Sequence, residues 1–445
     1  MPEISRRDFV AAATGIVAAS ALKTHGAEGG RRPNVLLIVT DDQGSIDLNC
    51  YGANDLVTPN LDALAARGVR FTQFYAAGAV CSPSRAAILT GRYPQHAQMP
   101  GNAPHQPGQQ GMPADQLTIA EMLKDASYVT GHIGKWHLGY TRETMPNGQG
   151  FDYSFGFMGG CIDNYSHFYY WSGPNRHDLW RNAQEVFHEG EYFGDLLVKE
   201  CNQFIERNKD RPFFLYYAIN KPHYPLQGTR KWRERYKNLP NPRGMYAASV
   251  STLDEEIGQV LQKIDDLGLR DDTIVIFQSD QGHSTEERTF GGGGNAGPYR
   301  GAKGSFYEGG VRIPAIISWP GHLPAGQVRG QMCTACDWMA TIAQLTGASL
   351  PKRPIDGRSL VQVIRSADAP ATHNVFHWAM GNQWAVRDGN WKLLSNTSGE
   401  AQDKLFLANL AEDVGEKKNL ASQYPEVVKR LVESHEQWAK DVLRQ

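Results

Sequence analysis

The residues with the clearest chemical potential lie in the segment Cys81-Ser82-Pro83-Ser84-Arg85, followed at once by Ala86-Ala87-Ile88-Leu89-Thr90-Gly91-Arg92. Ser82 can cap a helix, Pro83 suits the first helical position, and Gly91 can end the helix. The pattern therefore predicts that Cys81 stands just ahead of a helix N-terminus, where an anion is stabilised. An isolated cysteine at such a place is most often a small buried residue, so its role depends on what surrounds it.

Acidic residues follow two expected strands and predict a cation site. Asp41 and Asp42 come directly after residues 35–40, and Asp280 and Gln281 come after residues 273–278. Ligands of open α/β sheets bind where such strands end, and carboxylates gathered there would repel one another. A cation relieves this repulsion, and all-oxygen ligands favour Ca²⁺ or Mg²⁺ over zinc. An Asp-Asp pair standing alone would instead be interpreted as a loop or helix cap.

Basic and proton-carrying groups follow two further expected strands. Lys135 and His137 come after residues 129–133, and His223, held between two prolines, comes after residues 212–219. Each of these residues on its own is more typical of a solvated loop. Because all these strands can end at one edge of a sheet, a single site could collect them together with the acidic group.

Several of these segments resemble those of the formylglycine-dependent (type I) sulfatases, the arylsulfatases and N-acetylgalactosamine sulfatases among them. The Cys81 segment matches the C-x-P-S-R signature, and Gly134-Lys135-Trp136-His137-Leu138-Gly139 is similar to the second signature. The segment around His223 and the Gly301-Ala302-Lys303-Gly304 segment match further parts of the pattern, and the matches run in order from residue 34 to about residue 421. The resemblance implies an alkaline-phosphatase-like core and hydrolysis of a sulfate ester.

The resemblance also implies what matures the site and what it contains. A partner, the formylglycine-generating enzyme, would oxidise Cys81 to an aldehyde, whose hydrate is the nucleophile. One Ca²⁺ ion would be held by residue 81 and by Asp41, Asp42, Asp280 and Gln281. Many relatives have asparagine or histidine where this chain has Gln281. Gln281 can still offer a carbonyl oxygen, so the departure weakens only that one ligand assignment.

The same resemblance assigns roles in the reaction to basic residues. Arg85, Lys135 and Lys303 would offset the charge on the sulfuryl oxygens. His223 or Lys303 would protonate the departing alcohol oxygen, and His137 would take a proton from the second hydroxyl of the hydrate. The expected catalytic residues are therefore Cys81, Arg85, Lys135, His137, His223 and Lys303.

An aromatic and polar stretch over residues 163–182 indicates a carbohydrate substrate. We expect a sulfated sugar of galactose or N-acetylgalactosamine type, contacted by residues from this stretch, namely Asp163, Asn164, His167, His177 and Arg181. An aromatic cluster packed under a long loop is the competing interpretation. Two rival functions remain open: a phosphonate or phosphate ester hydrolase of the same superfamily, and an inactive glycan-binding homologue in which Cys81 is never converted.

The pattern of apolar runs predicts an α/β fold with a large, mostly parallel sheet flanked by helices. Expected strands cover residues 35–40, 129–133, 212–219, 273–278 and 313–318. Expected helices cover residues 59–67, 119–126, 196–208 and 247–267, the first capped by Thr58 and Gly68 and the second by a Thr118–Glu121 capping box. Residues 31–370 would form the catalytic domain. Three short strands (375–378, 383–387, 391–394) and a helix (425–442) would form a small C-terminal α+β subdomain over residues 371–445.

Composition and the N-terminus indicate an exported protein. The 445 residues carry a formal charge of −2, with 45 basic and 47 acidic residues well mixed, so no nucleic-acid partner is expected. Arg6 and Arg7 precede an apolar run over residues 9–22. This resembles a twin-arginine export signal within residues 1–30 and is shorter than the roughly 20 residues a membrane-spanning helix needs. We expect a periplasmic or extracellular protein without stable membrane insertion.

Cys333 and Cys336 are interpreted as packing residues. The alternative that they form a disulfide with each other is left open.

Overall fold

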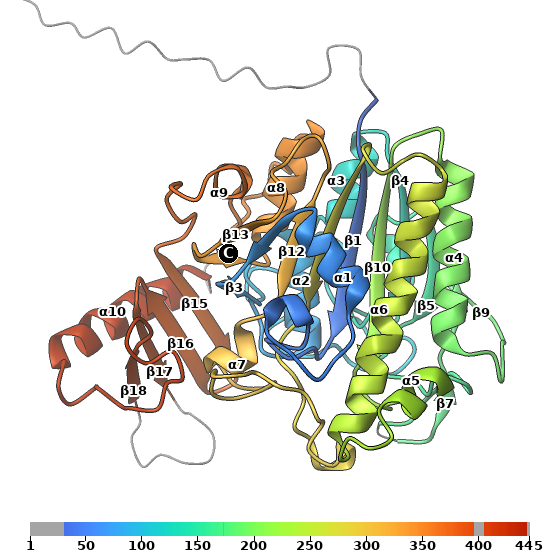
Figure 1. Cartoon of the computed structure of the whole chain (residues 1–445). Helices are drawn as coiled ribbons and strands as arrows, with labels where there is room; N and C mark the ends of the chain where they lie inside the picture. Colours follow the sequence, from blue (N-terminus) through green and yellow to red (C-terminus); the bar gives the residue numbers. More distant parts are fainter. Residues whose placement is uncertain (1–30, 172, 396–404, 443–445) are drawn as a thin grey trace, which may run out of the picture.

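The centre of the molecule is a ten-stranded sheet with the strand order β13-β2-β12-β11-β1-β10-β4-β5-β8-β9 (Figure 1). The computed structural model describes residues 31–171, 173–395 and 405–442, so the expected export signal lies outside the described residues. The five central strands of the sheet run parallel: β11 (Thr273–Ser279), β1 (Asn34–Asp41), β10 (Phe213–Pro222), β4 (Val129–Lys135) and β5 (Tyr153–Phe157). Their carboxyl ends therefore share one edge.

The outer strands make the sheet mixed. On one side, β12 (Ala315–Ser318) pairs antiparallel with β11 and with β2 (Val69–Phe71), and β13 (Gln327–Arg329) runs parallel to β2. On the other side, the short strand β8 (Trp180–Arg181) pairs antiparallel with β5, and β9 (Gln184–Glu185) pairs antiparallel with β8. Such antiparallel edges are common on large, otherwise parallel sheets.

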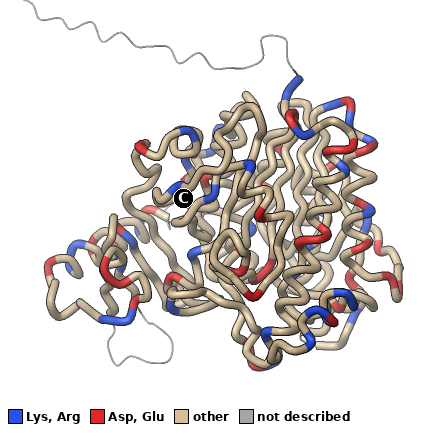
Figure 2. Tube along the Cα trace, in the orientation of Figure 1, with Lys and Arg blue, Asp and Glu red and all other residues tan. Residues whose placement is uncertain are grey.

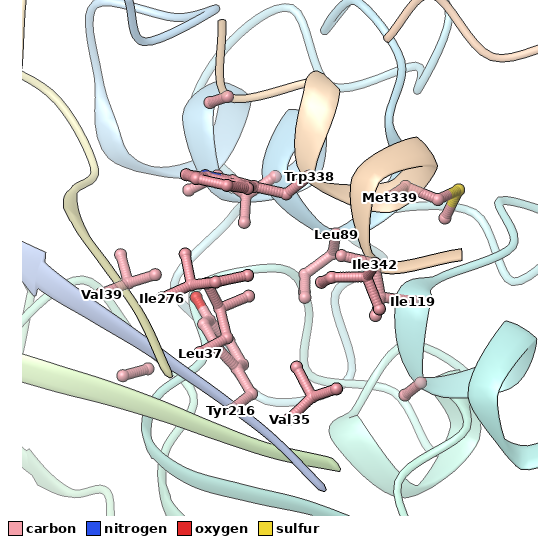
Figure 3. Packing of buried hydrophobic residues seen from close by; sticks show 14 of the residues in the cluster. Val35, Leu37, Val39, Leu89, Ile119, Tyr216, Ile276, Trp338, Met339 and Ile342 are labelled. Atoms are coloured by element: carbon pink, nitrogen blue, oxygen red, sulfur yellow. The ribbon is translucent and has the colours of Figure 1, made fainter. Parts of the chain in front are cut away.

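Strand β1 is buried on both faces, which explains its unbroken apolar run. Val35, Leu37 and Val39 point into one hydrophobic cluster, whereas Leu36 and Ile38 point into another, as the two-residue period of a strand requires. Figure 3 shows the first cluster, where β1 meets Trp338, Met339 and Ile342 of α8 (Asp337–Thr346).

Helices cover both faces of the sheet (Figure 1). The face with Leu36 packs against α1 (Pro59–Ala66), α4 (Phe193–Asn208) and α6 (Arg243–Asp266). The opposite face packs against α2 (Cys81–Thr90), α3 (Ile119–Asp125), α8 and α9 (Val361–Arg365). The expected α/β architecture is confirmed.

A second, four-stranded antiparallel sheet follows the core. It consists of β15 (Val375–Met380), β16 (Gln383–Asp388), β17 (Trp391–Ser395) and β18 (Leu405–Asn409), and α10 (Pro425–Val442) packs on it. Three strands and the helix were expected; β18 was not. Phe376, Trp378 and Phe406 share one buried cluster with Tyr75 of the core, so the small sheet is packed firmly against the larger one.

Short elements complete the fold. β3 (Phe74–Tyr75) pairs with β14 (Cys333–Thr334), and β6 (Phe168–Tyr169) pairs with β7 (Arg176–His177). The remaining helices are α5 (Arg230–Arg235), α7 (Glu308–Val311) and three 3₁₀ turns, Asn49–Tyr51, Pro146–Gln149 and Glu287–Thr289. Cys333 and Cys336 are buried free thiols, as their interpretation as packing residues requires.

The structure corrects three local predictions. α2 begins at Cys81 with Val80 as N-cap, because the Ser82 hydroxyl donates to the His137 carbonyl oxygen (2.7 Å) instead of capping the helix. Thr58 is the N-cap of α1 without a side-chain capping bond, and Arg67, not Gly68, is its C-cap. β12 starts at Ala315 rather than at residue 313. The capping box at Thr118 and Glu121 is confirmed.

Charged residues lie mainly on the outer helices and loops, with both signs interspersed (Figure 2). Within the described part of the chain, no helix combines the length and apolar character needed to cross a membrane.

Candidate active site

The parallel strands deliver most of the expected site residues to one edge of the sheet. Asp41 and Asp42 stand at the end of β1, Lys135 closes β4, His223 follows β10, and Asp280 follows β11. This is the place where open α/β sheets bind ligands. Asp42 and His137 both adopt left-handed backbone conformations, with φ of 63° and 57°. Such strain in residues other than glycine is typical of functional positions.

The acidic residues form the floor of the site. Ligand atoms of Asp41, Asp42, Cys81 and His223 all lie within 4.8 Å of one another. Asp280 adjoins them, because its Oδ1 accepts the backbone N–H of Asp42 at 3.1 Å. Burial and the nearby Asp41 carboxylate raise the pKa of Asp280. The carboxylates of Asp41, Asp42 and Asp280 therefore lie close together at this edge.

Three basic side chains face these carboxylates. The Lys135 Nζ lies 2.7 Å from Asp41 Oδ2, the Lys303 Nζ lies 2.8 Å from Asp42 Oδ2, and the Arg85 Nη2 lies 2.8 Å from Asp280 Oδ2. Burial alone would raise the pKa of Asp41, but Lys135 and Arg85 hold it well below its usual range.

The charges of the three carboxylates and the three basic side chains cancel at this edge. A bound divalent cation would therefore give the site a net positive charge, which suits an anionic substrate.

Cys81 stands at the first position of α2, at the centre of this cluster. Its Sγ lies 3.6 Å from Asp41 Oδ1 and 3.8 Å from Gln281 Nε2, and the residue is 2% exposed. Burial raises the pKa of the Cys81 thiol to about 12. The unmodified thiol therefore stays protonated at neutral pH and is a weak nucleophile.

Two histidines complete the site, and burial keeps both neutral. Burial lowers the pKa of His137 well below its ordinary value, and neither of its ring nitrogens has a hydrogen-bond partner within the described part of the chain. Burial likewise lowers the pKa of His223 to about 4. Its Nδ1 lies 2.8 Å from the Tyr224 carbonyl oxygen and so carries the proton, while its Nε2 lies 3.6 Å from Asp42 Oδ2. Both histidines can exchange protons with a bound molecule.

A cavity of about 200 Å³ opens above Cys81. Its lining includes His137, His223 and Lys303 together with residues that the sequence reasoning did not single out: Asn102, His105, Gly160, Cys161, Tyr224 and Glu286. Asn102 and His105 lie in a loop without any local motif, and only the fold brings them here. Trp171, which lies in the expected aromatic stretch, also lines the cavity.

The five expected substrate contacts are not brought together at this cavity. Asn164 is buried and bonded to Gln227, Arg181 pairs with Glu200, and the His177 Nδ1 lies 2.9 Å from a Glu185 oxygen. His167 is fully buried. Asp163 lines a second and larger pocket nearby. The other four make contacts that support the surrounding loop, so their part in substrate recognition stays a prediction.

Comparison with known proteins agrees with this geometry. A sequence model described as Sulfatase matches residues 33–348. The chain belongs to the sulfatase family. A second model, described as N-sulphoglucosamine sulphohydrolase, C-terminal, matches residues 301–441. This sulfatase is therefore a sulfuric ester hydrolase, and its fold agrees with the expected alkaline-phosphatase-like core.

Individual relatives of this sulfatase align over nearly its whole length. Arylsulfatase A of Homo sapiens is 34% identical, with 91% of this chain and 87% of the relative aligned. N-acetylgalactosamine-6-sulfatase of Homo sapiens is 33% identical, with 93% and 87% aligned. The crystal structure of Ps i-CgsB in complex with k-i-k-neocarrahexaose is similar with a TM-score of 0.84 and 32% identity, covering 92% of this chain and 93% of that chain.

Proposed function

We propose that this sulfatase removes sulfate from a sulfated carbohydrate of galactose or N-acetylgalactosamine type, using a formylglycine hydrate at position 81 beside a Ca²⁺ ion. The observation that carries the proposal is the position of Cys81. It lies against Asp41 and Gln281 at the floor of a cavity lined by His137, His223 and Lys303. N-acetylgalactosamine-6-sulfatase and the neocarrahexaose complex support a carbohydrate substrate by their names.

The residues present fit a Ca²⁺ ion. Asp41, Asp42 and Asp280 offer hard oxygen ligands, which Ca²⁺ prefers. The Gln281 side-chain nitrogen donates to Asp42 Oδ1, and its side-chain oxygen is buried without a hydrogen-bond partner among the described residues. A half-turn of this amide would direct the oxygen to a cation held beside Asp42. When bound, the ion would supply positive charge to the oxygens of the sulfate group.

The surroundings of residue 81 also fit conversion to formylglycine. As a protonated thiol, Cys81 could not attack sulfur effectively. The hydrated aldehyde would supply one hydroxyl for attack and a second whose deprotonation releases sulfate. A residue held at the start of a helix, next to positive charge, is well placed to meet an anionic sulfate group.

The remaining side chains would orient the ester and move protons. Lys135, Lys303 and Arg85 would stabilise negative charge on the sulfuryl oxygens, because they are held rigidly by their carboxylate partners. Lys303, which is charged, would donate a proton to the leaving alcohol oxygen directly. His223 carries its proton on Nδ1, so it would take up a second proton on Nε2 before it could serve as the donor instead. His137, with both ring nitrogens free of partners in the described structure, would accept the proton of the second hydroxyl.

We also propose that the chain is exported by the twin-arginine route. The support is sequence alone, Arg6 and Arg7 before the apolar run over residues 9–22. Fusion of residues 1–30 to a reporter should send it across the membrane, and replacement of both arginines by lysine should abolish the transfer. Transfer that persists in the double variant would contradict this route.

A substrate panel tests the proposed function directly. Converted enzyme would be given sulfated galactose, sulfated N-acetylgalactosamine, and the sulfate and phosphate esters of one common alcohol, and product release would be measured. We expect sulfate release from at least one sugar and a clear preference for the sulfate ester over the phosphate ester. A preference for the phosphate ester would favour the rival hydrolase function, and binding of the sugars without release would favour an inactive glycan-binding protein.

A further inference from the structure

A second pocket, of about 610 Å³, lies next to the catalytic cavity. Tyr224 lines both, so the two spaces are neighbours across this side chain. The second pocket is mostly apolar with a few polar groups, which is the usual character of a small-molecule site. Its lining includes Asp163, Ser166, Phe168, Tyr170, Asn175 and Arg288.

A stack of four side chains runs from the catalytic histidine to this pocket. The ring of His223 lies 4.0 Å from that of Tyr224, and Tyr224 stacks on Trp171 at 5.2 Å with the planes 21° apart. The guanidinium carbon of Arg288 lies 3.3 Å from the centre of the Trp171 ring. The stack forms a wall whose inner end, His223, lines the catalytic cavity and whose outer end, Arg288, carries a positive charge at the second pocket.

Apart from its contact with the Trp171 ring, the guanidinium of Arg288 makes only long contacts with the described part of the protein. Its Nε lies 3.6 Å from a Glu286 oxygen, and its Nη1 donates to the Trp171 carbonyl oxygen at 3.4 Å. Both contacts are long, and the side chain remains 46% exposed. A guanidinium has five N–H donors in a planar fork suited to a sulfate or carboxylate, so Arg288 can still bind an anionic group in front of it.

We propose that this pocket binds the sugar unit next to the sulfated one, and that Arg288 pairs with an anionic group on that unit. The inference rests on the proposed carbohydrate substrate and makes it more specific: the substrate is an oligosaccharide or polysaccharide with negative charge on adjacent units. Phe168, Tyr170 and Phe290, which line the pocket, offer aromatic packing surface to a sugar ring. Arg288 thus determines specificity and takes no part in the reaction itself.

The test compares Arg288→Gln with the parent enzyme on four substrates. These are an aryl sulfate, a disaccharide with a single sulfate, the same disaccharide with a second sulfate on the neighbouring unit, and one with a carboxylate there. A charge-assisted hydrogen bond contributes about 1.5–3 kcal/mol, so we expect kcat/KM for the doubly charged disaccharides to fall at least about tenfold more than for the aryl sulfate, mainly through KM. The two charged disaccharides distinguish sulfate from carboxylate as the partner.

Two further variants make the result interpretable. Arg288→Glu should reduce kcat/KM for the doubly charged disaccharides more than Arg288→Gln does, because it adds repulsion. Arg430→Gln removes an exposed arginine of the remote helix α10 that pairs with Asp388 of β16. This variant should show no substrate-dependent loss. Equal losses on all four substrates, or no loss in either Arg288 variant, would overturn the inference.

Direct binding separates this inference from the proposed function. The Cys81→Ala variant, which cannot turn over, should bind the disulfated disaccharide at least about tenfold more tightly than the Cys81→Ala, Arg288→Gln double variant does. If the parent enzyme hydrolyses none of the substrates while this difference is found, the proposed function fails and the subsite stands. If the sugars are hydrolysed but binding is unchanged, only the subsite is wrong.

Discussion

Among single residues, the two histidines of the site differ in what their hydrogen bonds allow. His223 is oriented by the Tyr224 carbonyl oxygen, whereas the ring of His137 is held by packing, with His105 at a centroid distance of 5.3 Å. A histidine without fixed partners can accept a proton and release it again during each cycle. The proposed roles therefore place His137 in the second half of the reaction.

We expect His137→Ala to separate the two halves of the reaction. The variant should release about one equivalent of alcohol per converted site and then stall, with steady turnover reduced about 10²–10⁴-fold. Rapid-mixing measurement of alcohol and sulfate in parallel checks this result. His322→Ala, an exposed histidine outside the site, is the control and should keep normal turnover. An equal slowing of both products without a burst would contradict the assigned role.

The sequence was informative about single residues only where a motif constrains them. Cys81, Lys135 and His223 gather at one edge because their motifs tie them to a helix start or to strand ends. Lys303 reaches the same place from the loop before α7. The loop over residues 163–182 carries no such constraint. There the residue types suggested sugar contacts, but side-chain pairing such as Arg181 with Glu200 depends on the folded loop.

At the scale of elements, the C-terminal sheet is tied to the core by a buried ionic cluster. The Nζ of Lys392 on β17 lies 2.8 Å from Glu308 Oε1 on α7 and 3.1 Å from Glu416 Oε1, and all three side chains are fully buried. Helix α7 begins at Glu308, five residues after Lys303. The cluster thus connects the small sheet to a segment of the active site.

Removal of the central lysine should destabilise the protein strongly. Lys392→Met would leave the buried Glu416 carboxylate without its cation and would leave Glu308 paired with Arg312, and breaking a buried pair costs about 3–5 kcal/mol. Denaturant unfolding measures this loss. Lys231→Met, which removes an exposed pair with Glu255, should cost less than about 1 kcal/mol. Similar losses in both variants would show that burial of the cluster does not matter.

Most elements could be predicted from hydrophobic patterning, and the exceptions have physical causes. β1 and β10 are continuous apolar runs because both are buried on two faces. The start of α2 was misplaced because Ser82, a good capping residue, is bonded to the His137 carbonyl oxygen instead. The antiparallel direction of β12 depends on pairing with β11 and β2, which local sequence does not encode.

For the whole molecule, the proposed Ca²⁺ site joins segments that are far apart in the sequence. Asp41 and Asp42 follow β1, residue 81 starts α2, and Asp280 follows β11. A cation that binds only the assembled site stabilises the entire fold through mass action. The division into domains at residue 370 remains a proposal, and the shared cluster of Tyr75 and Trp378 argues that both parts unfold together.

Ca²⁺ should therefore raise the unfolding temperature, and a chelator should lower it. At a free Ca²⁺ concentration about 100 times Kd, the gain is about 2.7 kcal/mol. Asp280→Asn should lose most of this response. Asp47→Asn, which alters a buried carboxylate paired with Arg243 outside the cluster, should keep it. A Ca²⁺ response that survives in Asp280→Asn would place the ion elsewhere.

The central claim is that oxidised residue 81 performs the chemistry, and the most direct measurement relates turnover to its conversion. Enzyme preparations with different converted fractions can be distinguished by intact mass, because conversion of the thiol to the aldehyde, which supplies the nucleophile, removes about 18 Da. Sulfate release per molecule should rise in proportion to the converted fraction and fall at least about 10⁴-fold in Cys81→Ala. Equal activity of fully unconverted protein, or of Cys81→Ala, would contradict the account.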